Sequence, residues 1–208
     1  AEAPADGDKK ADGEGEATDE KKGAVAKADG DKKADEAKKD AEAGATVGEP
    51  APDFTLTDQD GKEHKLSEYK GKIVVLEWTN PTCPYVERHY KAKTMSETLE
   101  AGGEDVVWLA VDSSHTVKPE AAKKWREEQG FSYPVLLDAK GEVGKTYGAK
   151  TTPHMYVVDA EGVLRYSGAI DDDERGKKED ATNYGAGAVE ALKAGKKVEP
   201  SETKPYGC

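Results

Sequence analysis

The sequence predicts an α/β fold in which helices cover both faces of a mixed β-sheet, with a disordered low-complexity segment ahead of it. Two observations predict this fold. Beyond residue 47, short apolar runs with β-branched members, which are typical of buried strands, alternate with helical segments. Near residue 160, two strand-like runs are separated only by a tight turn, so part of the sheet is expected to be antiparallel.

The first 46 residues differ sharply from the rest in composition. They consist almost entirely of Ala, Asp, Glu, Gly and Lys, and the motif ADGDKKAD occurs twice, at residues 5–12 and 28–35. This repeat has no apolar face that could stack on a neighbour, so it predicts a linker rather than a solenoid. Such a segment cannot bury enough apolar surface to offset the entropy of ordering. We therefore expect a disordered linker over residues 1–46 and one domain over residues 47–208.

The expected elements of the domain follow in order along the chain. The strands are a hairpin formed by Phe54–Leu56 and His64–Leu66, then Ile73–Trp78, Val106–Val111, Pro134–Leu137, His154–Val158 and Val163–Tyr166. The helices are a short turn capped by Ser67, one long helix from Pro84 through Val86–Leu99, and then Pro119–Gln129, Val143–Tyr147 and Ala186–Leu192.

The charge of the chain limits its partners. The formal net charge is −12, and no basic stripe is interleaved with aromatic residues, so we expect no nucleic-acid partner. The longest apolar run is about five residues, too short for a transmembrane helix. Because the chain begins with Ala1 rather than Met, we expect the mature form of an exported protein, periplasmic or tethered to a membrane through residues 1–46.

One of the two cysteines occupies a position suited to chemistry. Cys83 follows the buried strand Ile73–Trp78 and precedes Pro84, where a helix is expected to begin. A thiolate there faces unpaired backbone N–H groups and the positive end of the helix dipole, which lowers a thiol pKa and creates a nucleophile. The alternative is a small buried cysteine without chemistry.

Longer motifs make the sequence similar to a known family. The strand, the Trp and the Cys-Pro of EWTNPTCPYVERHY, together with TTPHM and the terminal TKPYGC, resemble the bacterial peroxiredoxin-like 1 redoxins. The segment VGEPAPDFTLTDQDG resembles the opening hairpin of the alkyl hydroperoxide reductase/thiol-specific antioxidant group. The resemblance covers about residues 47–208 and implies a thioredoxin-like, three-layer fold. It also implies that Thr151-Thr152-Pro153 is a cis-proline loop packed against the active cysteine.

Two positions depart from the patterns of these relatives. Val86 stands where a thioredoxin has its second cysteine, three residues after the first. Leu76 and Asn80 stand where a typical peroxiredoxin has Pro and Thr or Ser, although the Asn80 amide could still hydrogen-bond a peroxide. Neither exchange within one short dithiol motif nor standard peroxidase chemistry therefore transfers directly.

Several residues around Cys83 are candidates for supporting roles. Glu77 corresponds to the buried acid of thioredoxins and is expected to transfer protons, or alternatively to pair with a Lys or Arg. The resemblance implies that Thr152 and Pro153 align an extended substrate. Trp78 and Tyr85 flank the cysteine and are expected to form an apolar rim for a protein or peptide substrate, although core packing is an equal alternative for Trp78. Pro84 and Asn80 are further candidates for substrate binding.

Cys208, 125 positions after Cys83, is the second candidate catalytic cysteine. The chain beyond Gly195 spans roughly 40 Å if extended, so Cys208 could reach Cys83 and act as its resolving cysteine. A permanent bridge, an intermolecular bridge and a spare thiol remain as alternatives.

The remaining polar residues receive simpler interpretations. A copper site built from Cys83, His154 and Cys208 is conceivable, but no close ligand spacing supports it, so no metal or other cofactor is expected. We expect His64 and Arg88 on the surface, and Asp171–Asp173 in an exposed loop.

These observations lead to one main functional hypothesis and two alternatives. We expect a thiol-dependent oxidoreductase in which Cys83 attacks a peroxide or a protein disulfide, with an external thiol as reductant. The absence of a cysteine at Val86 favours the first alternative, a non-catalytic thioredoxin-fold binding module. The second alternative is a periplasmic metal-handling protein.

Overall fold

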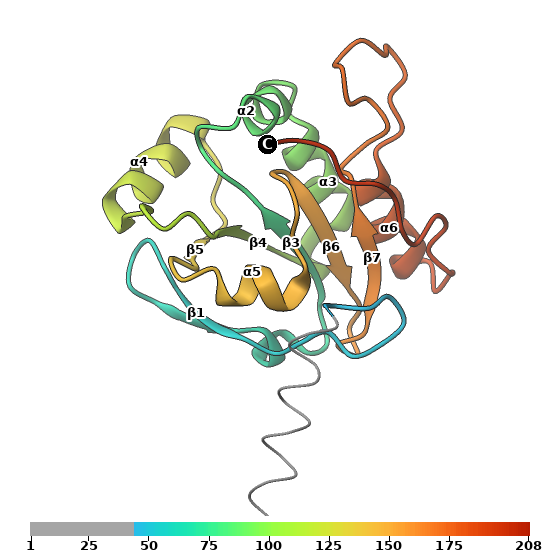
Figure 1. Cartoon of the computed structure of the whole chain (residues 1–208). Helices are drawn as coiled ribbons and strands as arrows, with labels where there is room; N and C mark the ends of the chain where they lie inside the picture. The colour runs from blue at the N-terminus through green and yellow to red at the C-terminus, as the bar shows by residue number, and fades with distance from the viewer. Residues whose placement is uncertain (1–43) are drawn as a thin grey trace, which may run out of the picture.

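The computed structural model describes residues 44–208, and the linker predicted over residues 1–46 lies almost wholly outside them (Figure 1). Its strands are β1 Thr55–Asp58, β2 Glu63–Lys65, β3 Ile73–Trp78, β4 Val106–Asp112, β5 Val135–Leu137, β6 His154–Val158 and β7 Leu164–Gly168. Its α-helices are α2 Pro84–Lys91, α3 Thr94–Gly102, α4 Pro119–Gln129, α5 Glu142–Tyr147 and α6 Tyr184–Lys193. Single 3₁₀ turns cover Leu66–Tyr69 and Gly103–Asp105.

The strands form one mixed sheet in the order β2-β1-β5-β4-β3-β6-β7. The central strand β3 runs parallel to β4 and antiparallel to β6, and β4 runs parallel to β5. The strand pairs β1–β2 and β6–β7 are antiparallel, as the two tight turns predict. The prediction of an α/β fold with a mixed central sheet is confirmed.

The two faces of the sheet carry separate cores. On β3, Ile73 and Val75 face a core to which α2, α3, α4 and α6 contribute, whereas Leu76 and Trp78 face a core that includes Tyr147 of α5. Glu77 alternates with Leu76 and Trp78, so it lies on the first face, together with Cys83. Helices therefore form outer layers on both sides of the sheet.

The long helix predicted after Pro84 is wrong, because the chain breaks between α2 and α3 (Figure 1). Lys93, between the two helices, adopts a left-handed conformation with a φ of 62°, so α3 does not continue along the axis of α2. The turn directs α3 toward α6, where Met95 and Thr98 are fully buried and the Thr98 hydroxyl accepts a hydrogen bond from Asn183 at 2.8 Å. Apolar periodicity alone did not reveal this break.

Two local expectations in the N-terminal hairpin are also wrong. Ser67 does not cap the 3₁₀ turn; instead its backbone N–H donates to the carboxylate of Asp53 at 2.9 Å. His64 is buried rather than on the surface, and its Nε2 lies 2.7 Å from a carboxylate oxygen of Asp58. Both contacts join residues on opposite sides of the β1–β2 hairpin.

The loop between β7 and α6 is more tightly held than its charge predicts. Asp171 and Asp173 are 6% and 8% exposed, so these two residues are buried rather than exposed as expected, whereas residues 174–182 of the same loop are exposed. Backbone N–H groups of Lys177 and Lys178 each donate to the Asp173 carboxylate at 3.0 Å. Arg88, expected on the surface, is partly buried and donates to backbone carbonyls of this loop.

After α6 the chain returns along β7. Glu202 forms a parallel bridge with Ser167, and the Thr203 hydroxyl accepts a hydrogen bond from the Ala169 N–H at 2.9 Å. Gly168 makes this crossing possible, because a Cβ there would lie 2.6 Å from the Thr203 carbonyl oxygen. The C-terminal residues are thereby directed toward the start of α2.

This crossing predicts a specific effect of Gly168→Ala. The added methyl must displace the Thr203 backbone, so we expect the free energy of unfolding to fall by about 1–3 kcal/mol. The matched control is Gly187→Ala in α6, where a Cβ meets nothing within 4 Å, and a gain of about 0.4–1 kcal/mol is expected. Urea unfolding measures both changes, and equal midpoints for the two variants would show that the crossing contributes nothing.

Candidate active site

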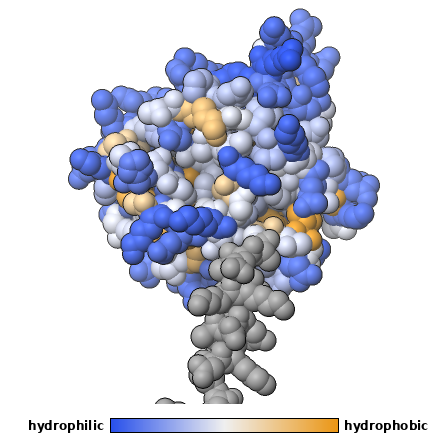
Figure 2. Space-filling view, in the orientation of Figure 1, coloured by the Kyte–Doolittle hydropathy of each residue, from blue (hydrophilic) through white to orange (hydrophobic). Residues whose placement is uncertain are grey.

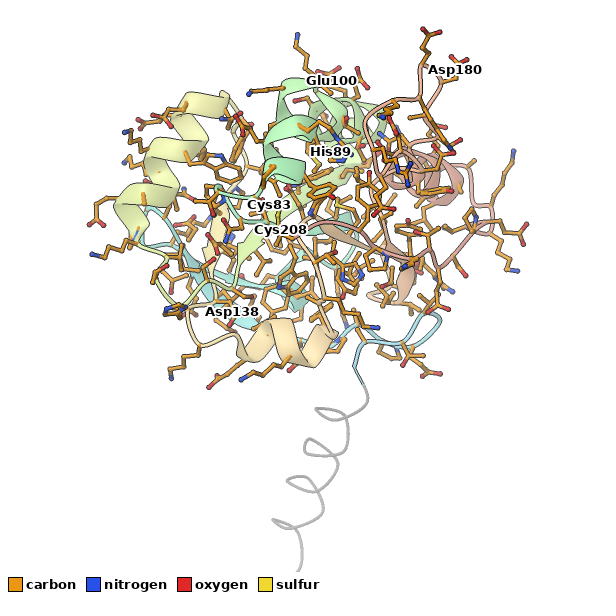
Figure 3. All side chains as sticks on the ribbon, turned by 45° about the horizontal axis from the view of Figure 1, so that its top comes forward. Cys83, His89, Glu100, Asp138, Asp180 and Cys208 are labelled. Carbon is orange, nitrogen blue, oxygen red and sulfur yellow. A yellow bond between two sulfur atoms is a disulfide. The ribbon has the colours of Figure 1, made fainter. Side chains whose placement is uncertain are left out.

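Cys83 and Cys208 are joined by a disulfide that connects the start of α2 to the C-terminal segment (Figure 3). Cys83 is the N-cap residue of α2, and Pro84 occupies the first helical position. The two Cα atoms are 6.0 Å apart, within the usual range for a disulfide. The structure thus pairs two cysteines 125 residues apart, which fits both a resolving Cys208 and a permanent bridge, and neither is a free thiol in this state.

The backbone around the disulfide forms a short antiparallel pair. The Cys208 N–H donates to the Thr152 carbonyl at 3.1 Å, and the Thr152 N–H donates to the Cys208 carbonyl at 3.2 Å. The Thr152–Pro153 peptide bond is cis, and Pro153 is buried. Cys83 Sγ lies 2.9 Å from the Thr152 carbonyl oxygen. The loop Thr151–Pro153 therefore holds an extended segment directly over the cysteine.

The two sulfur-bearing residues differ in accessibility. Cys83 is 3% exposed, whereas Cys208 is exposed. Thiol–disulfide exchange requires a thiolate to approach a sulfur atom in line with the bond that breaks. In the disulfide state, Cys208 is therefore the more accessible of the two residues.

Glu77 is fully buried on the strand that precedes Cys83. Its Oε2 accepts hydrogen bonds from the Tyr90 hydroxyl at 2.9 Å and the Trp108 indole N–H at 3.0 Å. Neither neighbour is a Lys or Arg, so the ion-pair alternative does not describe this site. Burial raises the pKa of the Glu77 carboxyl to about 7, although these hydrogen bonds oppose the rise.

The two oxygens of Glu77 are not equivalent. Oε2 already accepts two hydrogen bonds, whereas Oε1 makes none of normal geometry within the described part of the chain. The Thr79 side chain also interacts with the carboxyl and, like Tyr90 and Trp108, opposes the rise of its pKa. A carboxyl with a pKa near neutral pH can both take and give a proton.

The other predicted substrate-binding candidates occupy different environments. Pro84 is exposed and Tyr85 is half-buried on α2, while Trp78 is only 2% exposed and donates to the Ser113 hydroxyl at 3.0 Å. Asn80 is held by its own loop, because its oxygen accepts hydrogen bonds from the N–H and hydroxyl of Thr82. Trp78 thus belongs largely to the core.

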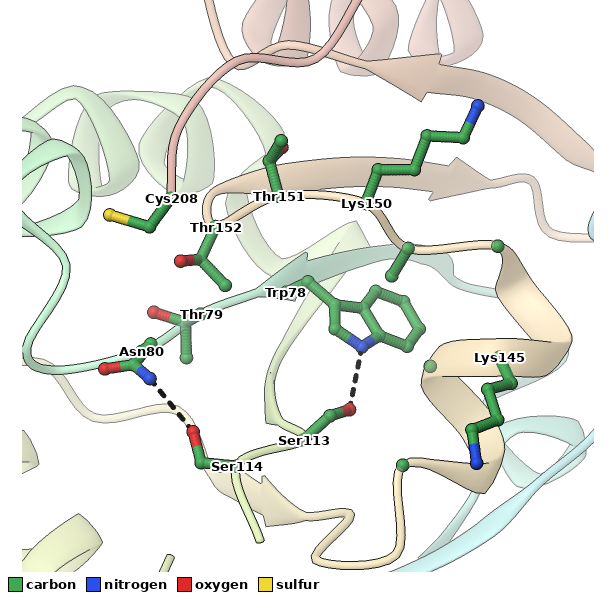
Figure 4. A pocket seen from close by; sticks show the side chains of 14 residues that line it. Trp78, Thr79, Asn80, Ser113, Ser114, Lys145, Lys150, Thr151, Thr152 and Cys208 are labelled. Atoms are coloured by element: carbon green, nitrogen blue, oxygen red, sulfur yellow. Dashed lines mark hydrogen bonds between the residues drawn. The ribbon is translucent and has the colours of Figure 1, made fainter. Parts of the chain in front are cut away.

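A surface pocket adjoins Cys208 on the side of Trp78 (Figure 4). Asn80 and Ser114 form part of its wall through a hydrogen bond of 2.9 Å. The side chains of Lys145 and Lys150 lie at the opposite side of the pocket in Figure 4. Of the substrate-binding candidates predicted from the sequence, this pocket brings Trp78, Asn80 and Thr152 together with Cys208, while Pro84 and Tyr85 line a separate surface hollow.

The conceivable copper site is not assembled. His154 lies on β6 with its ring 4.5 Å from that of Tyr156, in the core opposite Cys83, and its Nδ1 is 3.3 Å from the Lys150 N–H. Within residues 44–208, no group of three His, Cys, Asp or Glu side chains could hold a metal ion.

One residue near the site was not recognised from the sequence. Tyr206, two residues before Cys208, is half-buried between α2 and the loop after β7. The motif TKPYGC contains an aromatic residue at a fixed distance from a cysteine, and this spacing was the available signal.

Comparisons with known proteins show to which family the chain belongs. The AhpC/TSA family profile matches residues 47–167, more than half of the chain. The chain belongs to the AhpC/TSA family. Membership identifies it as an oxidoreductase, and the resemblance inferred from the sequence motifs is confirmed.

Two relatives show the range of the AhpC/TSA family. The thiol-disulfide oxidoreductase ResA of Geobacillus thermodenitrificans is 29% identical over 125 residues, which are 60% of this chain and 70% of ResA. A Mycobacterium tuberculosis protein whose name proposes a peroxiredoxin is 31% identical over 132 residues, which are 62% of this chain and 80% of that protein.

Solved structures confirm the thioredoxin-like fold. Their matches cover a larger share of the chain than the family profile does. An uncharacterized protein of Geobacillus kaustophilus has a TM-score of 0.70 at 28% identity, covering 78% of this chain and 90% of that protein. A hypothetical protein of Sinorhizobium meliloti has a TM-score of 0.69 at 29% identity, covering 78% and 92%. In the part of the chain with described structure, no helix is sufficiently long and apolar to cross a membrane.

The raised pKa of Glu77 predicts how stability depends on pH. As pH rises from 4.5 to about 7, Glu77 ionises in the unfolded chain while it stays protonated in the fold, so the wild type loses stability in this window. Glu77→Gln lacks this loss and keeps an oxygen acceptor for Tyr90 and Trp108. The stability of the variant minus that of the wild type should therefore grow by roughly 3 kcal/mol across this window.

Urea unfolding of both oxidised proteins between pH 4 and 8 measures this difference. A difference that does not vary with pH would contradict the assignment of a raised pKa to Glu77.

Proposed function

We propose that this protein is a thiol–disulfide oxidoreductase that uses Cys83 as the nucleophile and Cys208 as the resolving cysteine. The observation that carries the proposal is the Cys83–Cys208 disulfide, held against the backbone of Thr152 by reciprocal hydrogen bonds. The same arrangement suits an extended partner segment that carries a disulfide, because Thr152 pairs through backbone groups, which every peptide segment has.

The cycle begins with both cysteines reduced. The Cys83 thiolate attacks one sulfur of the partner disulfide, a bond forms between these two sulfurs, and the other partner sulfur leaves as a thiolate. The Cys208 thiolate then attacks Cys83 Sγ, forms the Cys83–Cys208 bond and releases the second partner thiolate. The protein has lost two electrons to the partner, and an external thiol must reduce it again.

The start of α2 and Glu77 support this chemistry in complementary ways. The N-terminus of α2 stabilises the Cys83 thiolate, both when it attacks and when it leaves during reduction. Glu77 is connected to α2 through the Tyr90 hydroxyl, and its carboxyl can take the thiol proton and return it to a leaving thiolate. Its raised pKa of about 7 suits both directions.

The surroundings of Cys83 favour a disulfide over a peroxide as substrate. The atom facing Cys83 Sγ at 2.9 Å is the Thr152 carbonyl oxygen, an acceptor that cannot donate to a peroxide. The Asn80 side chain, the peroxide ligand considered from the sequence, is engaged by Thr82 and Ser114. This geometry therefore favours disulfide exchange over peroxide reduction by Cys83 alone.

We also propose that the protein works outside the cytosol, where oxidised cysteine pairs persist. A disulfide that joins the two cysteines of the chain supports this proposal. Tethering through residues 1–46 remains part of the proposal, and fractionation of cells that produce the protein from its own gene tests it: recovery in the cytosolic fraction would contradict it.

The proposed roles predict different behaviour for two matched variants. Cys208→Ser should react once with a disulfide substrate at a rate within roughly threefold of the wild type, and should then persist as a covalent adduct at Cys83. Its steady-state turnover should fall by at least about tenfold, because the resolving step is missing. Cys83→Ser should react only at Cys208, as slowly as an ordinary free thiol, and should reduce disulfides no faster than that thiol does.

Intact-mass analysis and a disulfide-reduction assay, repeated with hydrogen peroxide, measure these outcomes. An equally fast reaction of Cys83→Ser with disulfides would overturn the assignment of the nucleophile. Faster oxidation of the wild type by peroxide than by any disulfide would assign the peroxide reaction instead.

A further inference from the structure

Tyr206 contacts polar side chains from α2 and from the loop after β7. Its hydroxyl donates a short hydrogen bond to the Asp171 carboxylate, and His89 Nε2 lies 3.1 Å from the same hydroxyl. The Arg88 guanidinium carbon lies 5.8 Å from the centre of the Tyr206 ring and 5.5 Å from that of Tyr85. We call Arg88, His89 and Asp171 the tyrosine subsite.

The tyrosine subsite is fixed by contacts that do not involve Tyr206. Arg88 donates to the backbone carbonyls of Asp173 and Glu174 at 2.8 Å each. The Asp171 carboxylate accepts the Asp173 N–H at 2.9 Å, and its backbone forms a bridge with Asn183. The buried carboxylate and the arginine are therefore expected to stay in place when the C-terminal segment leaves, and a phenol hydroxyl is the group that they fit.

Gly207 links Tyr206 in the tyrosine subsite to Cys208 in the disulfide, and its position has no room for a side chain. Its φ is +142°, and a Cβ at this position would lie 2.7 Å from the Thr152 carbonyl carbon and 3.2 Å from the Pro153 nitrogen. A side chain there would separate the backbone from the loop that pairs with Cys208. The site is thus complementary to the tripeptide Tyr-Gly-Cys as a unit.

The C-terminal segment is held at two separate places. Ser201–Thr203 is bonded to β7 by backbone hydrogen bonds of 3.1 Å, independently of the disulfide. The tip, Tyr206–Cys208, is held by the tyrosine subsite, Thr152 and the disulfide, and exposed Lys204 lies between the two places. Reduction of the disulfide removes the covalent link of the tip alone.

The surrounding surface favours recognition through these few contacts. Figure 2 shows a small apolar patch at the place where Figure 1 marks the C-terminus, surrounded by surface of intermediate hydropathy and by hydrophilic groups farther out. A partner docking here consequently depends on backbone pairing and on a specific side-chain subsite rather than on a broad apolar interface.

We propose that the tyrosine subsite selects partner segments in which a tyrosine and a glycine precede a disulfide-bonded cysteine, and that Tyr206 is its internal occupant. The proposal rests on the proposed thiol–disulfide activity and adds the substrate class. The tail and a partner segment compete for one slot, so the partner enters after reduction has released the tip. The tail returns when Cys208 resolves the partner.

Peptide disulfides test this selectivity directly. The full chain carrying Tyr206→Ala and Cys208→Ser leaves Cys83 as its one cysteine and weakens the internal occupant. The probes are the peptides Lys-Pro-Tyr-Gly-Cys, Lys-Pro-Phe-Gly-Cys and Lys-Pro-Ala-Gly-Cys, each as a mixed disulfide with thionitrobenzoate. Cys83 attacks the peptide sulfur, the bond from Cys83 to the peptide forms, and the coloured thionitrobenzoate thiolate leaves.

We expect the Tyr peptide to react about tenfold or more faster than the Ala peptide, with the Phe peptide between them. Asp171→Asn should reduce the preference for Tyr over Phe by at least about threefold. The matched control is Asp172→Asn, because Asp172 bonds Lys178 and Thr182 instead of Tyr206.

The outcomes separate this inference from the proposed function. Equal rates for the three peptides would overturn the tyrosine subsite while leaving the disulfide chemistry intact. No reaction of Cys83 with any of the peptides would overturn both. Because the peptide comparison uses one protein, it stands even if Asp171→Asn does not fold.

Discussion

The pairing of Cys208 with Thr152 is the interaction on which the rest of the site depends. Two backbone hydrogen bonds and one disulfide bring the C-terminal segment over the start of α2. Gly168 permits the segment to cross β7, and Gly207 permits its close approach to the cis-proline loop. The family profile ends at residue 167, so this chain completes a family scaffold with a segment that lies beyond the profile.

The same scaffold buries Cys83 and Glu77 in surroundings that suit the chemistry proposed for them. Cys83 is 3% exposed in the disulfide state, with Cys208 lying over it, and Glu77 is sealed between β3, β4 and α2. Burial raises the pKa of Glu77 to about 7, and the start of α2 favours a thiolate nearby. The C-terminal segment covers Cys83 while the disulfide is intact, so access to the Cys83 thiol depends on the redox state of the pair.

Much of the fold could be predicted from local sequence, because buried strands and glycine or proline boundaries are local signals. The bounds of α4 and the antiparallel pairing of β6 and β7 are examples. The break before α3 could not be predicted, since it depends on packing against α6. Cys83 was recognisable from its strand–helix junction, whereas the burial of Asp171 and its bond to Tyr206 join segments 35 residues apart.

The central claim is that Cys83 and Cys208 form one reversible two-electron couple in the folded protein. Equilibration of the native protein in glutathione buffers of varied potential, followed by alkylation and intact-mass analysis, tests it most directly. The account predicts a single transition between the disulfide and the doubly alkylated dithiol, with little glutathione adduct. A disulfide that stays intact until the protein unfolds, or a stable glutathione adduct at Cys83 with Cys208 free, would contradict it.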